Sequence, residues 1–225
     1  MKIKNKKKFG VFEPTGTSKL LLESSRKYLK KNKKILDLGC GTGVIGLEIS
    51  QILKNSVYLS DISKEAIKVA KLNNKKIGKK NIIKQGSFFE PWKGKKFDLI
   101  ICDVAGVSEK ISNYTPWYKN SVPNGSGNDG TENIVKVIDE AEKYLSKKGK
   151  LLVAVISLSD HKKILKFAKK KFLNFKLLNK QEWPLPKEMY KYKKKLNDAN
   201  AKNLISIKKK YNIIIYWTEI YAIWN

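Results

Sequence analysis

The fold of this 225-residue chain is decided by one stretch, Lys34-Ile35-Leu36-Asp37-Leu38-Gly39-Cys40-Gly41-Thr42-Gly43-Val44-Ile45-Gly46. Its apolar run, residues 35–38, predicts a short buried strand, and the three closely spaced glycines predict a tight turn. Apolar residues then recur at helical spacing as far as Leu53, which predicts a helix. A strand, a glycine turn and a helix in this order form the first half of a nucleotide-type binding unit. Glycine suits the turn because it lets a ligand lie against bare main chain.

The spacing of the glycines separates two kinds of binding site. Dinucleotide-binding enzymes need the pattern G-x-G-x-x-G, whose third glycine would fall at Val44 here. The chain instead has G-x-G-x-G, with Asp37 two residues before Gly39. A carboxylate at that position would repel a pyrophosphate but could hold the ammonium group of a ligand. The spacing therefore argues against a nicotinamide dehydrogenase, and an ordinary glycine-rich turn of another α/β protein is the alternative.

The same stretch resembles the first motif of class I S-adenosylmethionine-dependent methyltransferases, whose common form is hhDhGxGxG. The resemblance implies an α/β fold, a Rossmann-like seven-stranded sandwich whose last strand is antiparallel. It also implies S-adenosyl-L-methionine as the cofactor. In such a site Asp37 and the turn that contains Gly39, Cys40, Gly41 and Gly43 would hold the amino-acid end of the cofactor.

The segment before this motif carries a second resemblance. Gly10-Val11-Phe12-Glu13-Pro14-Thr15-Gly16-Thr17-Ser18 is similar to the region that precedes the first motif in release-factor glutamine and N6-adenine methyltransferases. There a Pro-rich turn with Thr or Ser closes over the amino-acid end of the cofactor, which makes Thr17 a candidate cofactor residue. A helix that runs to about Leu29 follows, and its capping by Thr17 or Ser18 alone would explain these residues.

The second predicted strand, residues 57–61, ends in a carboxylate. Asp61 lies 18 residues after Gly43, and a carboxylate at that strand end can accept hydrogen bonds from both hydroxyls of a ribose. The resemblance implies that Ile62 flanks the adenine. A cap for the next helix is the alternative for Asp61, but Ser63 already suits that position.

The third predicted strand, residues 81–85, leads to the run Ser87-Phe88-Phe89. In the resembling family the side chain at the Ser87 position is often Asp and meets the adenine amino group. A serine hydroxyl can make the same contact more weakly, and Phe88 can pack on the ring. Packing in the core or anchoring of a loop would explain the aromatic residues equally well.

The fourth predicted strand ends at the residues that decide the chemistry. Release-factor and N6-adenine methyltransferases carry N-P-P-Y or D-P-P-Y here, whereas this chain reads Asp103-Val104-Ala105-Gly106. Asp103 keeps the hydrogen-bond acceptor, and it is both the candidate catalytic residue, facing the methyl group, and a candidate cofactor-binding residue. The aromatic platform is lost, and stacking of this kind is worth roughly 1–3 kcal/mol in nucleobase systems. Tyr114, Trp117 or Tyr118 in the following loop could replace it.

The chain is predicted to divide into two parts. Residues 1–31 form a basic segment and a lead-in helix, and residues 32–225 form the catalytic domain with an insertion near 183–210. We expect a hairpin between residues 205–208 and 213–223 at the end of the chain. An insertion between the last two strands commonly shapes the substrate side in this superfamily, and a solvated helical excursion without function is the alternative.

The formal net charge of +28 invites a nucleic-acid interpretation, since lysines near phosphates release counterions. Only Arg26 among the 48 basic residues is arginine, however, and nucleic-acid interfaces favour the planar fork of arginine. A uniformly solvated lysine surface with nonspecific nucleic-acid contact is therefore the simpler interpretation.

Two cysteines, Cys40 and Cys102, form neither a disulfide framework nor a metal-binding spacing, so no metal is predicted. They suit a reducing cytoplasm. No signal peptide is predicted, and the apolar runs are too short to span a bilayer.

Together these features predict a cytoplasmic S-adenosylmethionine-dependent methyltransferase with an unidentified acceptor, for which N-methylation of protein or RNA is favoured. Methylation of a small metabolite is one alternative. The other is a module that binds the cofactor without turnover and associates with RNA, for which the lost N-P-P-Y motif and the lysine excess argue.

Overall fold

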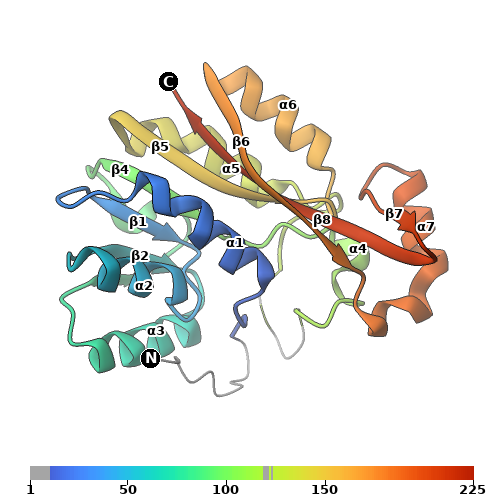
Figure 1. Cartoon of the computed structure of the whole chain (residues 1–225), viewed down its shortest axis with the longest axis horizontal. Coiled ribbons are helices and arrows are strands. Elements are labelled where there is room, and N and C mark those ends of the chain that lie inside the picture. The colour runs from blue at the N-terminus through green and yellow to red at the C-terminus, as the bar shows by residue number, and fades with distance from the viewer. Residues whose placement is uncertain (1–10, 119–121, 123) are drawn as a thin grey trace.

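The structure, a computed structural model, describes residues 11–118, 122 and 124–225, so the predicted basic segment 1–10 lies outside the described residues. Eight strands of this part form one sheet (Figure 1). They are β1 (Ile35–Leu38), β2 (Tyr58–Asp61), β3 (Ile82–Gln85), β4 (Phe97–Cys102), β5 (Leu145–Ile156), β6 (Asn174–Pro184), β7 (Lys208–Lys210) and β8 (Ile213–Trp224).

The helices of this part alternate with the strands along most of the chain. They are α1 (Gly16–Ser25), α2 (Val44–Leu53), α3 (Lys64–Ile77), α4 (Glu109–Ser112), α5 (Glu132–Ala141), α6 (His161–Lys171) and α7 (Lys193–Ala201). Four 3₁₀ turns join them, namely η1 (Arg26–Tyr28), η2 (Glu90–Trp92), η3 (Glu142–Tyr144) and η4 (Lys187–Tyr192).

The order of the strands in the sheet is β3-β2-β1-β4-β5-β8-β6, and β7 pairs only with β8 beside this path. The pairs among β1 to β5 are parallel, whereas β8 is antiparallel to both β5 and β6. The predicted Rossmann-like α/β fold with an antiparallel last strand is therefore confirmed, and β7 adds an eighth strand to the seven of the path. The strand order reverses between β1 and β4, which opens a crevice at their carboxyl ends.

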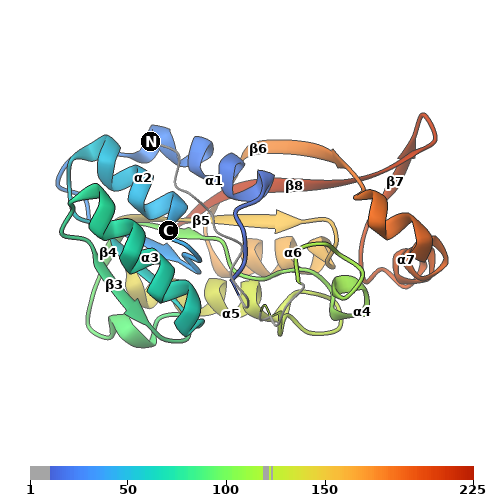
Figure 2. The ribbon, with the colours of Figure 1, turned by 90° about the horizontal axis from the view of Figure 1, so that it is seen from below.

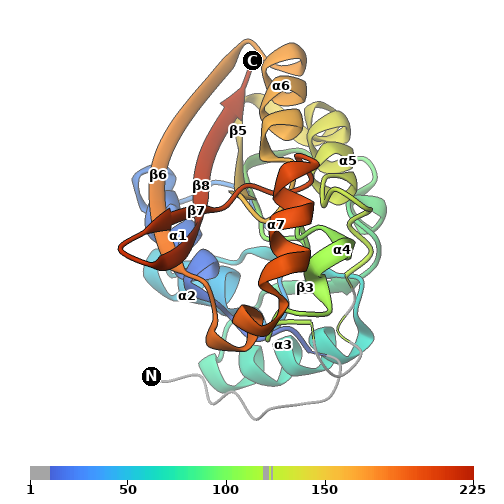
Figure 3. The ribbon, with the colours of Figure 1, turned by 90° about the vertical axis from the view of Figure 1, so that its right-hand side faces the viewer.

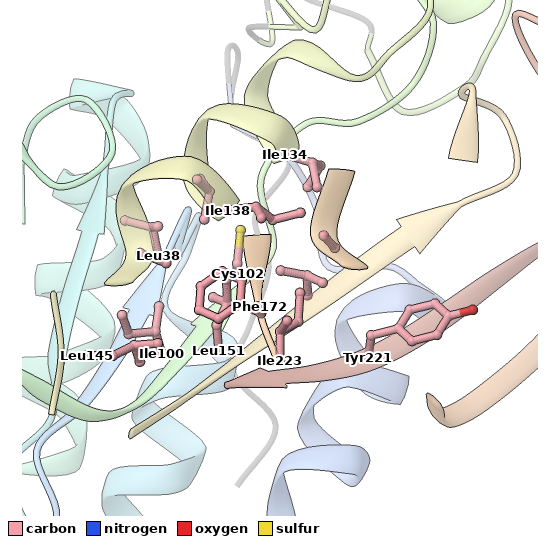
Figure 4. Packing of buried hydrophobic residues seen from close by; sticks show 14 of the residues in the cluster. Leu38, Ile100, Cys102, Ile134, Ile138, Leu145, Leu151, Phe172, Tyr221 and Ile223 are labelled. Atoms are coloured by element: carbon pink, nitrogen blue, oxygen red, sulfur yellow. The ribbon is translucent and has the colours of Figure 1, made fainter. Parts of the chain in front are cut away.

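Helices cover both faces of the sheet, α1 and α2 on one face and α5 and α6 on the other (Figure 2). The strands alternate accordingly. In β4 the side chains of Leu99 and Ile101 pack with α1 and α2, while Ile100 and Cys102 pack with α5 and α6. Figure 4 shows the second of these clusters, in which buried side chains of α5, β1, β4, β5 and β8 meet. Burial on both faces explains why the parallel strands read as continuous apolar runs.

The N-cap of helix α1 lies two or three residues before the predicted cap. Thr15 is the N-cap and accepts a hydrogen bond from the Thr17 amide, so the prediction that Thr17 or Ser18 caps this helix is wrong. The side chain of Ser18 instead accepts a bond from the Thr15 amide at 3.4 Å, which completes a capping box. Leu20 and Leu21 of α1 join the core beside α2, and the predicted division after residue 31 stays a prediction.

The predicted insertion lies between β6 and β8 and forms a small core of its own with the loop around α4 (Figure 3). Met189, Leu196 and Ile205 of the insertion are buried against Val107 and Ile111. The predicted hairpin exists, but its first strand is β7 at 208–210 and not 205–208, because Ile205 turns into this core. No described helix is both long and apolar enough to cross a membrane.

Candidate functional site

A cavity of about 380 Å³ lies at the carboxyl ends of β1, β2 and β4. Its walls come from the segment before α1, the glycine turn, the strand ends and the first part of the insertion. Apart from Asp37 and Gly43, every residue predicted for the site contributes to them. These are Thr17, Gly39, Cys40, Gly41, Asp61, Ile62, Ser87, Phe88 and Asp103, while Gly43 lies beside them at the start of α2.

The glycine turn has the backbone that only glycine adopts without strain. The φ angles of Gly39, Gly41 and Gly43 are 76°, 52° and 84°. A Cβ on Gly39 would lie 2.8 Å from a methyl group of Val104, so this glycine lets β1 and β4 end side by side. A Cβ on Gly41 would meet only the Phe12 carbonyl oxygen, at 3.8 Å, because this residue faces the cavity. The turn thus presents bare main chain to a ligand.

Asp61 ends β2 with both carboxylate oxygens directed at backbone amides. Oδ2 accepts from the Gly41 amide and Oδ1 from the Ser63 amide, both at 2.8 Å. Burial raises the pKa of Asp61, and these amide bonds act against the rise. Each oxygen keeps acceptor capacity for a further donor from the cavity, since a carboxylate has about four lone-pair sites.

Asp103 follows β4 directly, on the other side of β1. Its Oδ2 accepts a hydrogen bond of 2.6 Å from the Ser18 hydroxyl at the start of α1. Burial raises the pKa of Asp103, the Ser18 bond opposes the rise, and the charge of Asp61 adds to it. A carboxylate with a raised pKa, fixed by a hydroxyl donor and open to a cavity, is a suitable proton acceptor.

Asp37 lies behind the glycine turn and does not line the cavity. Its Oδ2 accepts from the Gly46 amide at 2.8 Å, and its buried Oδ1 has no hydrogen-bond partner among the described residues. Burial raises the pKa of Asp37 to about 8, and the charges of Asp103 and Asp61 contribute to the rise. A direct contact between Asp37 and a ligand's ammonium group stays a prediction.

Replacing Asp37 with asparagine is expected to make the free energy of unfolding less dependent on pH. The folded wild type holds a proton up to its pKa of about 8, whereas the unfolded chain releases it near the ordinary aspartate pKa of 3.8. Wild-type stability therefore falls as the pH rises between these values, by at most about 1.4 kcal/mol for each pH unit. Asp37→Asn keeps an acceptor for the Gly46 amide. Its free energy of unfolding, measured with urea, should therefore rise relative to that of the wild type between pH 5 and pH 8. A stability difference between variant and wild type that is the same at both pH values would contradict this.

The charge of the cavity is opposite to that of the chain. Despite the net charge of +28, the residues that line the cavity include Asp61 and Asp103 and no lysine, arginine or histidine among those that the structure describes. A cavity with uncompensated carboxylates repels phosphate groups and attracts a cation. This contrast favours a positively charged ligand and disfavours a dinucleotide.

Three residues that line the cavity suit a flat ring. Ile62 is 59% exposed, and Ser87 lies in the loop that follows β3. Phe88 adopts a φ of 45°, which a bulky side chain rarely does. Strained backbone of this kind is often kept at ligand sites.

Aromatic side chains form the opposite wall, and the sequence pointed to only part of it. Tyr118 lies 5.6 Å from Phe12 between ring centroids, and Trp117 lies 5.7 Å from Tyr216. All four line the cavity, as does Trp183. Burial and the charge of Asp103 raise the pKa of Tyr118 far above its usual value. Of the three aromatic residues considered for the lost platform, Tyr114 is the one outside the cavity; it stacks on Tyr192 at 4.2 Å.

Segments far apart in the sequence meet in this wall. The indole of Trp183 lies against Gly16, where an added Cβ would be 2.5 Å from the ring. The indole N–H donates to the Thr218 hydroxyl at 3.2 Å, and that hydroxyl lies 3.1 Å from the hydroxyl of Thr17. These contacts tie the segment before the first motif to β6 and β8.

A family model described as a methyltransferase domain matches residues 29–218. The chain belongs to this family. The chain is 32% identical to a putative protein N5-glutamine methyltransferase of Methanocaldococcus jannaschii, over 74% of its own length and 82% of the relative. It is 30% identical to a release factor glutamine methyltransferase of Borreliella burgdorferi, over 64% of its own length and 52% of the relative. The chain thus spans about half the length of the release factor enzymes that it matches.

A solved structure has the same fold as this chain. Ribosomal protein L11 methylase from Lactobacillus delbrueckii subsp. bulgaricus superposes with a TM-score of 0.58, over 92% of this chain and 80% of that chain. The sequence identity is 16%, so the likeness concerns the arrangement of the elements. The predicted resemblance to class I methyltransferases is confirmed, and S-adenosylmethionine is the cofactor of that class.

The residues that line the cavity suit this cofactor in charge and leave polar main chain open to it. Two lining carboxylates without a basic neighbour suit its sulfonium and ammonium groups. Gly41 opens onto the cavity, and the buried hydroxyl of Thr42 has no partner among the described residues. A ligand that lies along the turn can provide this partner.

Proposed function

We propose that this methyltransferase transfers a methyl group from S-adenosylmethionine to a nitrogen of a protein side chain. The observation that carries the proposal is Asp103, a buried carboxylate with a raised pKa that ends β4 at the cavity and is held by Ser18. The relatives named as glutamine methyltransferases support a planar amide nitrogen as the acceptor.

The roles proposed for the cofactor residues follow from their places in the wall. Asp61 would accept the ribose hydroxyls, while Ile62, Ser87 and Phe88 would hold the adenine. The turn around Cys40 and the side chain of Thr17 would receive the amino-acid end of the cofactor. When bound, the cofactor supplies a methyl group on a positively charged sulfur, and this sulfur becomes a neutral thioether once the methyl group is transferred.

The residues of the chain then position the nucleophile and accept its proton. Asp103 accepts a hydrogen bond from the acceptor nitrogen and takes up the proton that this nitrogen loses. Ser18 keeps the carboxylate in one orientation, since it donates to Oδ2 and leaves Oδ1 for the substrate. The aromatic wall excludes water, and a dry surrounding strengthens the attraction between Asp103 and the polarised N–H.

Tyr118 is proposed to replace the aromatic platform that is missing from Asp103-Val104-Ala105-Gly106. It lines the same cavity as Asp103, although it comes from the loop after α4. The Ala105 carbonyl accepts a hydrogen bond of 3.1 Å from the side-chain amide of Asn133, which holds the altered motif in place. A planar amide could then lie between the Tyr118 ring and the Asp103 carboxylate.

Replacing Tyr118 with alanine is expected to lower kcat/KM for the acceptor by roughly 10- to 100-fold, the effect of losing one stacking contact. Tyr118→Phe keeps the ring and should lose less than about threefold. The two variants are compared in steady-state assays at saturating cofactor. Equal losses for both would assign the role to the hydroxyl and not to stacking.

Transfer of a tritiated methyl group tests the proposed function. Purified protein is incubated with labelled cofactor and a cell extract, and the label is followed into protein, RNA and small molecules. Protein label that an acid hydrolysate releases as methylamine supports an amide nitrogen as acceptor. Label in RNA or in metabolites overturns the protein acceptor, and no label in any fraction overturns catalysis in favour of a module that only binds the cofactor.

The cytoplasm is proposed as the compartment of this protein. Cys40 and Cys102 are free and buried, and burial raises the pKa of both thiols, which keeps them unreactive. Free thiols are typical of reducing compartments.

A further inference from the structure

The hairpin of β7 and β8 has an exposed aromatic tip. Tyr211 and Asn212 form its two-residue turn, with φ angles of 46° and 63°. Such turns require positive φ at both positions and favour Asn and Gly. Tyr211 is 88% exposed, and its ring contact among the described residues is Lys210, whose ammonium lies 5.9 Å from the ring centroid.

This hairpin extends the sheet beyond the edge at which the cavity lies. The last residue of β5, Ile156, pairs with Thr218 of β8, and β7 pairs next with 213–215 along the same side of β8. Strand β7 thus continues past the carboxyl end of β5. The tip projects from the body in Figure 2, and Tyr216 at the base of the hairpin lines the cavity.

The charge around the hairpin exceeds that of the rest of the surface. Residues 185–215 contain nine lysines against two acids, Glu188 and Asp198, whereas the whole chain has 48 basic and 20 acidic residues. All three residues of β7 are exposed lysines. Among the described residues of 185–215, Lys208 is the lysine with an ion pair, to Glu182 of β6.

The tyrosine at the tip does not serve the stability of the hairpin. A left-handed conformation costs a residue with a Cβ roughly 1–2 kcal/mol, and Asn would fit the turn with less strain. The side chain also buries little surface in return. Phe88 is the other aromatic residue with positive φ among the described residues, and it lies in the cavity wall. Backbone strain at a residue that does not stabilise the fold, as at Tyr211, points to a contact with a partner.

We propose that this hairpin binds single-stranded RNA, with the lysines of β7 on phosphates and a base stacked on Tyr211. Lysine neutralises phosphates as a point charge, and an exposed ring stacks with any base. Phosphate contacts and stacking on a ring both tolerate any base, so the binding is expected to be independent of sequence. An exposed ring beside the lysines favours RNA over an acidic protein, which offers carboxylates but few flat groups.

The decisive variant is Tyr211→Asn, because its effects on binding and on stability have opposite signs. Binding is measured by fluorescence anisotropy with a labelled single-stranded RNA of about 15 nucleotides, within the usual site size. We expect a roughly 5- to 100-fold loss of RNA affinity, as for one stacked base. Heparin, an anion without bases, should bind as before, and the Tm should not fall below that of the wild type.

The lysines are tested by a pair of matched double variants. Lys209→Gln/Lys210→Gln removes two charges from β7, and Lys75→Gln/Lys76→Gln removes two exposed lysines from α3, on the far side of the molecule (Figure 1). The first pair should lower the slope of log affinity against log salt by about 1.4, and the second should leave it nearly unchanged.

Three outcomes would overturn the proposal. Unchanged RNA affinity in Tyr211→Asn removes the stacking role, and equal losses in both lysine pairs mean that the whole lysine surface binds. Poly-glutamate binding as tight as RNA binding and equally dependent on Tyr211 would assign the hairpin to an acidic protein. None of these assays uses methyl transfer, so their result is separate from the fate of the proposed function.

Discussion

Alanine at position 61 is expected to weaken binding of the cofactor product S-adenosylhomocysteine by at least about 100-fold in isothermal titration calorimetry. Two hydrogen bonds from ribose hydroxyls to a carboxylate are worth roughly 1.5–3 kcal/mol each, and both are lost. The change also frees the amides of Gly41 and Ser63, which Asp61 holds at 2.8 Å, so the glycine turn loses its support.

Two further variants separate binding from folding. Asp61→Asn keeps one acceptor oxygen and should fall between the wild type and alanine. Asp98→Ala is the matched control, because Asp98 also accepts from a backbone amide, that of Lys34 at 2.9 Å, but lies at the amino end of β4, away from the cavity. It should lower the Tm without changing the affinity. Normal affinity in Asp61→Ala would remove Asp61 from the cofactor site.

Alanine at position 103 is expected to lower kcat by about 100-fold or more, the usual effect of removing a positioned general base. The affinity for S-adenosylhomocysteine should stay within about fivefold of the wild type, because Asp103 is assigned to the nucleophile and not to the cofactor. Stopped activity assays and calorimetry on the same preparation measure the two quantities. Full activity of Asp103→Ala would take this residue out of the mechanism.

Replacing Ser18 tests the role of Asp103 through the pH dependence of kcat. Its hydroxyl donates to Asp103 and holds the pKa of that carboxyl down against burial. Ser18→Ala should therefore raise the pKa of Asp103, and the acidic limb of the kcat profile should move to higher pH. Asp103→Asn should abolish this limb. A helix cap alone would change the Tm of the Ser18 variant and leave the pH profile in place.

Local patterns explain how much of the fold could be predicted. Strand, turn and helix around Gly39–Gly43 depend on residues close in sequence, and each element lies where the pattern predicts it. The carboxylates at 61 and 103 can be found because parallel strands bring their carboxyl ends together. The same reasoning assigns the Asp37 side chain to the ligand, yet its strand position directs it toward the Gly46 amide of α2.

Contacts between distant residues explain what could not be predicted. The bond between Ser18 and Asp103 joins positions 85 apart, and no periodicity marks it. The place of Tyr118 depends on how the loop after α4 packs against the insertion, which buries Met189 and Leu196. The first strand of the last hairpin lies further along the chain than predicted for the same reason, since Ile205 is buried in that small core.

The contact of Thr17 with Thr218 joins positions 201 apart, and this separation governs when the cavity forms during folding. Contacts that close long loops form late, because the entropy of closure is lost before the contact is made. A nascent chain on the ribosome already holds the glycine motif when β8 has not yet been synthesised. It lacks Thr218 and Tyr216, so the cavity is completed only when the final strand enters the sheet between β5 and β6.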